Sequence, residues 1–250
     1  MKILVSIKRV PDPYAKVRLD ANGNIDESDF SWVINPFDEI ALEEAVRIRK
    51  SGLTVEIVAV SIGTSEWDTQ LKTALAMGAD RAILVLDDEP ADPGSVSHLL
   101  AAVARREQPD LILMGKQATD DDFNQTVQRL AAILDYPQAT FASAIQLTPD
   151  GRHARVTREV DAGRETLEVA LPAVISADLR LNEPRYVALP AIIKARSKPL
   201  EQIPTSEFGT RRPVGSQTIK MEMPPRRSAG RKVQSIDELV TIIRTATGRN

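Results

Sequence analysis

The feature that most constrains the fold is a repeated alternation of short apolar runs with helical patterns. Apolar runs lie at 3–7, 55–60, 81–86 and 110–114, and helical patterns follow them along the chain. Runs of this length read as strands that are buried on both faces. A strand, a helix and a further strand form a right-handed crossover, so such strands pair in parallel with helices on both faces of the sheet. The sequence therefore predicts an α/β fold with an open, mostly parallel, doubly wound sheet.

Antiparallel additions are expected beside this sheet. Residues 17–33 read as a hairpin with a turn at 20–23, and residues 154–171 read as a second hairpin with one wet face. Residues 172–176 form a short apolar run that we expect to return to the main sheet. The predicted α/β domain therefore ends at residue 183, and the 154–171 hairpin is an addition to it.

The last part of the chain differs in composition. Prolines recur from residue 184 onward, at positions 184, 190, 199, 204, 213, 224 and 225. A region so rich in proline is not expected to form a compact α/β layer. We predict that residues 184–250 form an extended arm that lies on another subunit and that ends in an amphipathic helix over 236–243.

Composition excludes several classes of protein. The net charge of −3 does not suggest nucleic acid as a partner, and the absence of cysteine rules out thiolate metal sites and thiol nucleophiles. His98 and His153 lie in different segments, which argues against a histidine metal site or relay. No apolar run approaches the roughly 20 residues of a membrane span. The chain enters a strand at residue 2, so we expect no targeting peptide and a cytoplasmic location.

The segment 115–126 follows an apolar strand and precedes the helical pattern at 127–134, so it lies where ligands bind in open parallel sheets. The free N–H groups of the helix favour an anion, whereas Asp120, Asp121 and Asp122 do not. Carboxylates, free amides and the hydroxyl of Thr126 together indicate a cradle for a nucleoside phosphate. A well-capped surface helix explains the same residues equally well.

A second helix start is clear at 35–39. Asn35 suits the N-cap, Pro36 suits the first helical position, and the acidic residues Asp38 and Glu39 complement the helix dipole. The amide of Asn35 could also reach a ligand, although capping is the favoured interpretation. Lys8 and Arg9 end the first strand and either face a ligand or are merely solvated.

The sequence offers little support for a catalytic site. No glycine pattern of the dinucleotide-binding or phosphate-loop type follows a strand, and no catalytic pair of carboxylates, serine elbow or base–nucleophile set stands out. A nucleotide-hydrolysing or adenylating enzyme would need a pyrophosphate loop after the first strand, where Lys8–Pro11 stands instead. A nucleotide-sensing module would leave the long arm unexplained.

Four ordered motifs resemble the electron transfer flavoprotein beta subunit family: Asn35–Ala45, Thr73–Asp80, the 115–126 loop and Ala177–Tyr186. The resemblance extends from about Ile3 to Arg244. It implies an adenine-nucleotide-binding type of sheet and a heterodimer with an alpha subunit. The heterodimer would hold one FAD for electron transfer and one AMP buried in the beta subunit.

The resemblance also implies the residues that hold the AMP. They would come from the first strand, from the helix start at 35–38, from the end of the second parallel strand and from the 115–126 loop. These residues are Ser6, Asn35, Pro36, Phe37, Asp38, Ile62, Gly115, Lys116, Gln117, Ala118, Thr119, Asp120, Asp121, Asp122, Phe123, Asn124, Gln125 and Thr126. By the same resemblance, Tyr14 would lie at the edge of a FAD site held mainly by the alpha subunit.

Partner contacts are implied as well. Residues 186–194 resemble the family's recognition loop for acyl-CoA dehydrogenases, with Leu189 held out as an apolar anchor before Pro190, and with Ile193 and Lys194 beside it. The other interpretation is that Leu189 packs inward beneath the arm. Glu159 matches a carboxylate that pairs with an arginine of the mobile flavin domain, an exposed contact worth roughly 0–1 kcal/mol.

The implied function is that of an electron carrier subunit rather than an enzyme. It would pass electrons from acyl-CoA dehydrogenases and other flavin dehydrogenases, in fatty acid oxidation, to a membrane quinone oxidoreductase. The alternative is an electron-bifurcating homologue, in which a second FAD replaces AMP and NAD(H) is a partner. The sequence Asp120–Thr126 resembles the AMP type, so the bifurcating alternative ranks lower.

Overall fold

The computed structural model describes residues 1–89, 91–209, 215, 218–227 and 229–248. The chain divides into two compact units. The larger unit contains residues 1–16 and 27–218, and the smaller unit contains residues 17–26 and 219–250.

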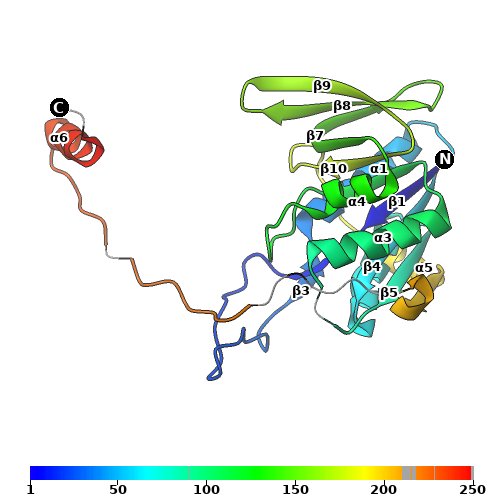
Figure 1. Ribbon diagram of the computed structural model, residues 1–250, viewed down its shortest axis with the longest axis horizontal. Helices are drawn as coiled ribbons and strands as arrows, with labels where there is room; N and C mark the ends of the chain where they lie inside the picture. The colour runs from blue at the N-terminus through cyan, green and yellow to red at the C-terminus, as the bar shows by residue number, and fades with distance from the viewer. Residues whose placement is uncertain (90, 210–214, 216–217, 228, 249–250) are drawn as a thin grey trace. The chain divides into compact units, whose positions relative to one another are not determined.

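The larger unit is built on a sheet of nine strands among the described residues (Figure 1). Their order across the sheet is β11-β5-β4-β1-β6-β10-β7-β8-β9. Neighbouring strands from β11 to β7 are parallel. Strand β8 is antiparallel to both of its neighbours, β7 and β9. The predicted open, mostly parallel sheet is thus confirmed. The strands are β1 (Lys2–Ser6), β4 (Glu56–Gly63), β5 (Arg81–Leu86), β6 (Leu111–Gly115), β7 (Gln138–Leu147), β8 (His153–Val160), β9 (Gly163–Ala170), β10 (Ala173–Ala177) and β11 (Leu200–Pro204).

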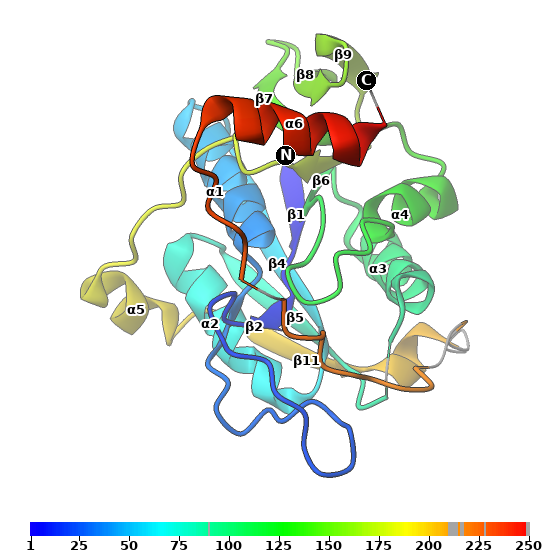
Figure 2. The same cartoon turned by 90° about the vertical axis from the view of Figure 1, so that its left-hand side faces the viewer.

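Helices cover both faces of the parallel part of the sheet (Figure 2). One face carries α1 (Pro36–Lys50) and α2 (Asp68–Met77), and the other carries α3 (Pro93–Glu107) and α4 (Thr126–Leu134). Side chains of β1 alternate between the two cores, since Ile3 and Val5 pack on the α1 side and Leu4 packs on the α3 side. Burial on both faces explains why the strand is apolar throughout, and each such side chain stabilises the fold by about 1.5–3 kcal/mol.

The first predicted hairpin is largely wrong. Within 17–33, Leu19 and Ile25 form a single isolated antiparallel bridge in the smaller unit. The extended residues near the end of the segment, β3 (Trp32–Ile34), pair instead with β2 (Arg9–Pro11). Pro11 stops further pairing because it has no N–H to donate, so this second sheet is short.

The second predicted hairpin is present as β8 and β9, but it belongs to a three-stranded unit. Strand β7, which precedes it, was not predicted, and it connects the hairpin to β10 of the parallel sheet. Two register shifts interrupt β7, and Phe141, at the first of them, has a φ of 61°. Such irregularity removes the simple alternation by which a strand is recognised in sequence.

The prediction that no compact layer follows residue 184 is wrong. Strand β11 pairs in parallel with β5, and its residue Ile203 is 2% exposed. Before it lies α5 (Leu189–Ala195), and the short 3₁₀ helices are η1 (Ser65–Trp67) and η2 (Thr205–Phe208). The predicted ranges 1–183 and 184–250 therefore do not coincide with the two compact units.

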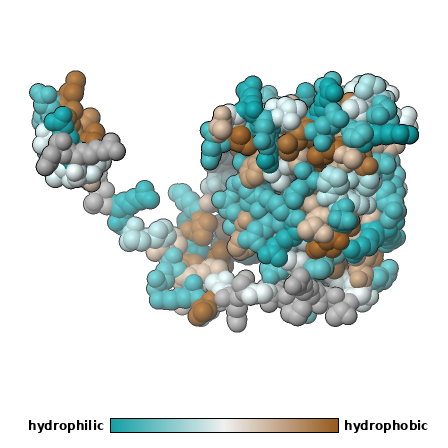
Figure 3. All heavy atoms as spheres, turned by 45° about the horizontal axis from the view of Figure 1, so that its top comes forward, coloured by the Kyte–Doolittle hydropathy of each residue, from teal (hydrophilic) through white to brown (hydrophobic). Residues whose placement is uncertain are grey.

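The smaller unit ends in α6 (Ile236–Thr247), which includes the predicted 236–243 helix and extends beyond it. Ser235 caps α6 by accepting a hydrogen bond from the Glu238 N–H at 3.2 Å. Its apolar side chains, among them Ile236 and Ile243, are exposed. On the larger unit, the face seen in Figure 3 is mainly hydrophilic and shows apolar side chains in separate patches. None of the helices within the described ranges is both long and apolar enough to cross a bilayer.

Candidate functional site

The sheet changes direction at β1. The chain passes from β1 to β4 and β5 on one side and then returns to β6 on the other side. At such a switch point the loops leave in opposite directions and open a crevice at the carboxyl ends of the strands. A cavity of about 570 Å³ lies there, within the range of small-molecule sites.

Most of the predicted nucleotide contacts line this cavity, including Ser6 at the end of β1 and Ile62 near the end of β4. The structure therefore brings together segments that are far apart in sequence. The predicted residues in the lining are Ser6, Asn35, Asp38, Ile62, Gly115, Lys116, Gln117, Ala118, Asp120, Asp121, Phe123, Asn124, Gln125 and Thr126.

Five predicted residues lie outside the lining: Pro36, Phe37, Thr119, Asp122 and Tyr14. Pro36 opens α1, and Phe37 is buried beneath Gly115. Asp122, at a φ of 54°, accepts a hydrogen bond from the Gln117 side chain. Thr119 is exposed, and Tyr14 is 95% exposed. Tyr14 is thus open to contact with another molecule, whereas Phe37 supports the cavity from behind.

Asp38 joins the two strands at the switch point. Its carboxylate accepts hydrogen bonds from the Lys8 N–H at 2.8 Å and from the Gly115 N–H at 2.9 Å. A Cβ at position 115 would lie 2.5 Å from Asp38 Oδ1 and 2.7 Å from Phe37 Cβ, so only glycine permits this approach. Burial raises the pKa of Asp38 to about 7, although the two N–H donors oppose that rise.

Asn35 does not cap α1, and the favoured interpretation of this residue is wrong. It stands at the N-cap position, but its side chain accepts no hydrogen bond from the helix. Its Nδ2 instead donates to the Gln117 carbonyl at 2.9 Å, which ties α1 to the 115–126 loop. Its Oδ1 is buried and has no hydrogen-bond partner within the described chain. An orphaned buried acceptor costs about 1–3 kcal/mol, so it indicates a ligand that donates a hydrogen bond.

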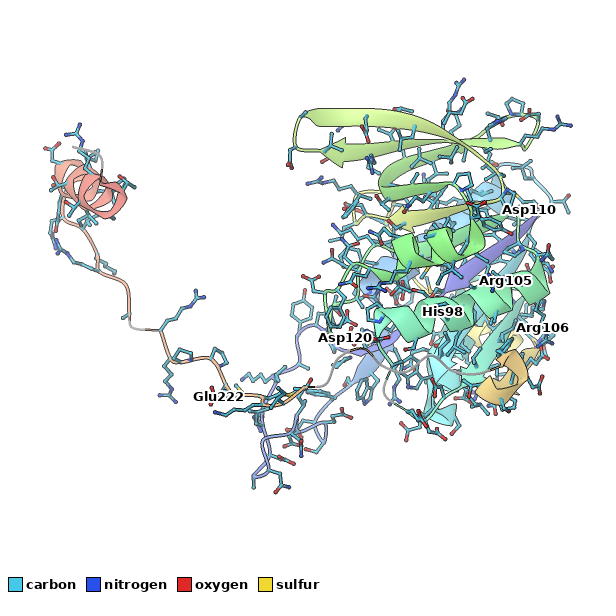
Figure 4. All side chains as sticks on the ribbon, in the orientation of Figure 1. His98, Arg105, Arg106, Asp110, Asp120 and Glu222 are labelled. Atoms are coloured by element: carbon cyan, nitrogen blue, oxygen red, sulfur yellow. The ribbon has the colours of Figure 1, made fainter. Side chains whose placement is uncertain are left out.

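The three loop aspartates do not cap α4 either. Lys8 Nζ lies 2.8 Å from Asp120 Oδ1 and 2.7 Å from Asp121 Oδ2, so two carboxylates meet one ammonium. Burial opposes the charge on Lys8, but hydrogen bonds from its Nζ to both carboxylates outweigh it and raise its pKa. In Figure 4, Asp120 lies at the end of the sheet where α3 begins, and Arg105 and Arg106 lie at the other end of that helix.

Of the helices that begin at the cavity, α3 and α4 differ in capping. Asp92 caps α3 by accepting from the Ser95 N–H at 2.7 Å in a capping box. At α4 the N-cap residue Gln125 gives no side-chain cap, and its Oε1 accepts from Arg129 instead. The first N–H groups of α4 are therefore available to an anion, together with the positive end of its dipole.

Lys116 is held in place beside the cavity. Its Nζ lies 2.8 Å from Asp178 Oδ2, and it lies over the rings of Phe37 and Phe141 at 5.4 and 5.3 Å. Its charge is thus balanced within the chain. With Lys8 also paired, both lysines of the lining have carboxylate partners within the chain.

Several lining residues were missed from the sequence. The acidic loop after β5 borders the cavity, and apolar residues of α3 and β6 form part of the wall. These residues are Trp67, Asp87, Asp88, Glu89, Asp92, Val96, Leu100 and Met114. A usable signal existed, because any loop that leaves the carboxyl end of a parallel strand beside the switch point faces the crevice.

The predicted partner residues lie on the surface. Leu189 is 68% exposed and Ile193 is 57% exposed, so packing of Leu189 beneath the arm is wrong. Pro190 and Lys194 are exposed on the same helix, which begins at Leu189 rather than after it. Glu159 forms ion pairs with Arg180 and, at 3.8 Å, with Arg164.

Known proteins resemble the chain over most of its length. Residues 22–207 match the electron transfer flavoprotein domain family. The chain is 45% identical over 249 residues to the electron transfer flavoprotein subunit beta of Bradyrhizobium diazoefficiens, with 99% of each chain covered. It is 48% identical to the mitochondrial subunit beta of Arabidopsis thaliana, with 96% of each covered. It is 46% identical to the human subunit beta, with 96% of this chain and 95% of the human one covered. The chain therefore belongs to the electron transfer flavoprotein beta subunit family.

Proposed function

We propose that the chain is the AMP-holding subunit of a heterodimeric electron carrier, in which an alpha subunit holds most of the FAD. In this proposal the carrier takes electrons from acyl-CoA dehydrogenases and other flavin dehydrogenases and delivers them to a membrane quinone oxidoreductase. FAD supplies the redox chemistry when bound, and this chain supplies the nucleotide cavity and a docking surface.

The observation that carries the AMP proposal is the unmet hydrogen-bonding capacity of the cavity. Asn35 Oδ1 lacks a donor, and the N-terminus of α4 lacks a side-chain cap. A nucleoside monophosphate could bind both groups. Its amino and hydroxyl groups could donate to Asn35 Oδ1, and its phosphate could accept from the N–H groups at the start of α4. Apolar side chains such as Ile62 and Met114 give the cavity the surface that an adenine ring requires.

The carboxylates around the cavity favour a monophosphate over a longer phosphate chain. Asp87, Asp88 and Glu89 line one side of it, and Asp120 and Asp121 line another. Each further phosphate would bring negative charge toward these groups, whereas one phosphate is accommodated at the α4 N-terminus. A bound AMP would add its binding free energy to the stability of the folded chain.

Nucleotide analysis tests this proposal. The complex with the alpha subunit is purified, denatured, and its released nucleotides are separated and quantified. One AMP and one FAD per heterodimer are expected. Two FAD and no AMP would contradict the AMP proposal and would support the bifurcating alternative, in which NAD(H) is a partner.

The FAD proposal rests on the exposed Tyr14, which projects from the larger unit and is free to contact an alpha subunit. This chain would then contribute only an edge of the flavin site. Expressed alone, it should therefore lack stoichiometric FAD. Tight binding of FAD by the isolated chain would contradict this assignment.

The docking proposal rests on the exposed Leu189 at the start of α5, with Ile193 one turn later. Leu189→Ala should raise the KM for a dehydrogenase while AMP and FAD contents stay unchanged, because an apolar anchor is lost and the cavity is not touched. Unchanged kinetics would remove Leu189 as an anchor. For Glu159, we propose a weak, exchangeable pairing with the alpha subunit, and Glu159→Gln should alter flavin reduction kinetics but not AMP content.

We propose a cytoplasmic location for this chain. The related plant chains are named mitochondrial. Cell fractionation with an antibody to this chain tests the inference, and recovery from an organelle or membrane fraction would contradict it.

A further inference from the structure

The larger unit carries an exposed apolar patch, here called the α5 patch, made of Tyr186, Leu189, Ile192 and Ile193. Tyr186 lies just before α5, and the other three recur at helical spacing along it. Their exposed fractions run from 43% for Ile192 to 96% for Tyr186. Apolar side chains that stay in water on a short helix need support from elsewhere, since a helix of this length is not stable alone.

The chain before the patch is fastened to α1. Arg185 donates to Glu43 through Nε at 2.6 Å and through a second guanidinium nitrogen at 2.7 Å, and its own N–H donates at 3.3 Å. The Glu43 side chain is 8% exposed, so this two-pronged pair is shielded from water. Burial opposes the charge on Glu43, yet the contacts from Arg185 outweigh it and hold its pKa below the usual value.

Asn182 adds to the same attachment. Its Nδ2 donates to Glu44 Oε2 at 2.9 Å and to the Ile40 carbonyl at 3.1 Å. Leu181 beside it is 7% exposed and joins the core beneath α1 and α2. Five hydrogen bonds from Arg185 and Asn182 to α1 thus fix the direction in which the chain leaves toward Tyr186.

The chain after the patch is fastened to α2. Lys198 Nζ donates to the Leu75 carbonyl, in the last turn of α2, at 2.8 Å and to the Ala79 carbonyl just after the helix. The Leu75 carbonyl is one of those that a helix C-terminus leaves without internal partners. Burial lowers the pKa of Lys198. Ala195, the last residue of α5, is 4% exposed and packs in the core, so the helix is closed at this end.

We propose that Arg185 and Lys198 are positioning residues that hold the α5 patch in its docking conformation. The inference rests on the proposed docking function and extends it from the anchor Leu189 to the groups that orient the anchor. A patch fixed at both ends loses little conformational entropy when a partner binds, so the partner binds more tightly without any new contact. The partner surface that fits is an apolar pocket, because the patch itself is apolar.

Lysine is not an adequate substitute for arginine at position 185. A single ammonium cannot reproduce the two parallel bonds that Arg185 makes to Glu43, although it keeps the charge. Arg185→Lys therefore loosens the attachment without leaving Glu43 as an unpaired buried charge. Lys198→Met keeps most of the side-chain volume at the other end and removes only the donor to α2.

The test uses the heterodimer with its nucleotides bound, reduced by an acyl-CoA dehydrogenase. Arg185→Lys and Lys198→Met should each raise the KM for the heterodimer by about fivefold, with kcat within about twofold. Reduction of the flavin by dithionite and the AMP and FAD contents should not change. Arg106→Gln is the matched control, since it breaks an exposed ion pair with Glu201 on the opposite face and should leave KM unchanged.

Hydrogen exchange supplies a second readout that does not involve a partner. In the free heterodimer, exchange of the amides over 186–196 should rise in both variants and stay unchanged in the control. If Leu189→Ala raises KM and the two variants raise neither KM nor exchange, the positioning proposal is overturned and the docking function stands.

If Leu189→Ala leaves KM unchanged, the docking function itself fails. Should Arg185→Lys not fold, Glu43→Gln replaces it, because the neutral amide still accepts a hydrogen bond from Arg185. Increased exchange and a raised KM in Glu43→Gln support the proposal. If neither the exchange nor the KM rises in this variant, the proposal is overturned.

Discussion

The two ends of the parallel sheet differ in how their buried polar side chains are paired. At the amino end, Lys2 and Arg81 both form ion pairs with Glu107, whose side chain is 8% exposed. Lys2 Nζ lies 3.2 Å from Glu107 Oε2. Arg81 also donates to Glu56 at 2.7 Å. At the carboxyl end, Asn35 leaves an acceptor unused, and burial raises the pKa of Asp38 to about 7.

The difference teaches where a ligand belongs. At the amino end, burial would raise the pKa of Glu107, but the bonds from Arg81 and Lys2 outweigh it and lower that pKa. The charge is fully compensated, so this cluster needs nothing from outside. At the carboxyl end the protein keeps polar groups that only an added molecule can satisfy, which is a cost to the empty chain and a benefit once the molecule binds.

The largest expected effect comes from breaking the paired end. Glu107→Gln removes the negative charge that holds Arg81 and Lys2, so the free energy of unfolding should fall by about 3 kcal/mol. The AMP content should stay the same, because Glu107 lies at the far end of the strands from the cavity lining. Denaturant unfolding and nucleotide analysis of the same preparation measure both. Loss of AMP with unchanged stability would remove the distinction between the two ends.

The next effect concerns Asp38 and pH. Its pKa is about 7 in the folded chain against an ordinary value of 3.8, so between these values the folded state holds a proton that the unfolded state has released. Its stabilising contribution is complete below about pH 4 and is lost as pH rises toward 7, with a loss of about 2–3 kcal/mol between pH 5 and pH 7.5.

The variant Asp38→Asn separates the contribution of Asp38 to the pH dependence of stability from that of the other titrating groups. The free energy of unfolding is measured for both chains at pH 5 and at pH 7.5, without AMP. The wild-type chain should lose more stability over this interval than the variant does, because the amide does not titrate. Glu39 and Glu44, whose pKa values burial also raises, contribute equally to both chains and cancel. Equal pH dependence in both would show that Asp38 is ionised throughout.

A smaller effect is expected from Asn35→Ala. The variant loses the bond to the Gln117 carbonyl and removes the orphaned acceptor. Affinity for AMP should fall by about 1–3 kcal/mol, roughly 5- to 150-fold, as a ligand donor loses its partner. Calorimetric titration of AMP into the nucleotide-free heterodimer measures this change. If AMP binds Asn35→Ala as tightly as wild type, the orphaned oxygen does not face the ligand.

The smallest effect is expected for Arg106→Gln. Arg106 pairs with Glu201 at 2.6 Å, but both side chains are more than 40% exposed. The free energy of unfolding should change by about 0–1 kcal/mol, because water already solvates both groups. This variant sets the scale for Glu107→Gln, and a loss as large as that of Glu107→Gln would mean that burial does not govern these pairs.

Sequence patterns predicted the elements that local chemistry decides. The start of α1 at Pro36 and the strands β1, β4 and β5 follow from apolar runs and from proline at the first helical turn. Strand β11 was missed because it is short, ends in Pro204 and exists only through its pairing with β5. An edge strand tolerates proline, so proline there is a weak signal against a strand.

Most of the predicted site residues line one cavity, but their hydrogen-bond partners were not predicted. The sequence placed Asn35 at a helix start, which is correct, and gave its side chain to the helix, which is wrong. The residue that receives its hydrogen bond, Gln117, is brought near only by the pairing of β1 with β6. Likewise, the pairing of Asp120 and Asp121 with Lys8 crosses more than a hundred residues of chain. Such contacts are set by the tertiary fold and have no local pattern.

The position of β1 has a consequence for biosynthesis. Of the strands in the sheet, β1 is synthesised before the others; its neighbour β4 is complete by residue 63, whereas its other neighbour β6 is complete only at residue 115. At about 5–20 residues per second, several seconds separate the two pairings. During that interval one edge of β1 is open to other chains, and the nucleotide crevice does not yet exist. A ligand of this crevice, such as the AMP proposed above, could therefore act only on a sheet that is already assembled.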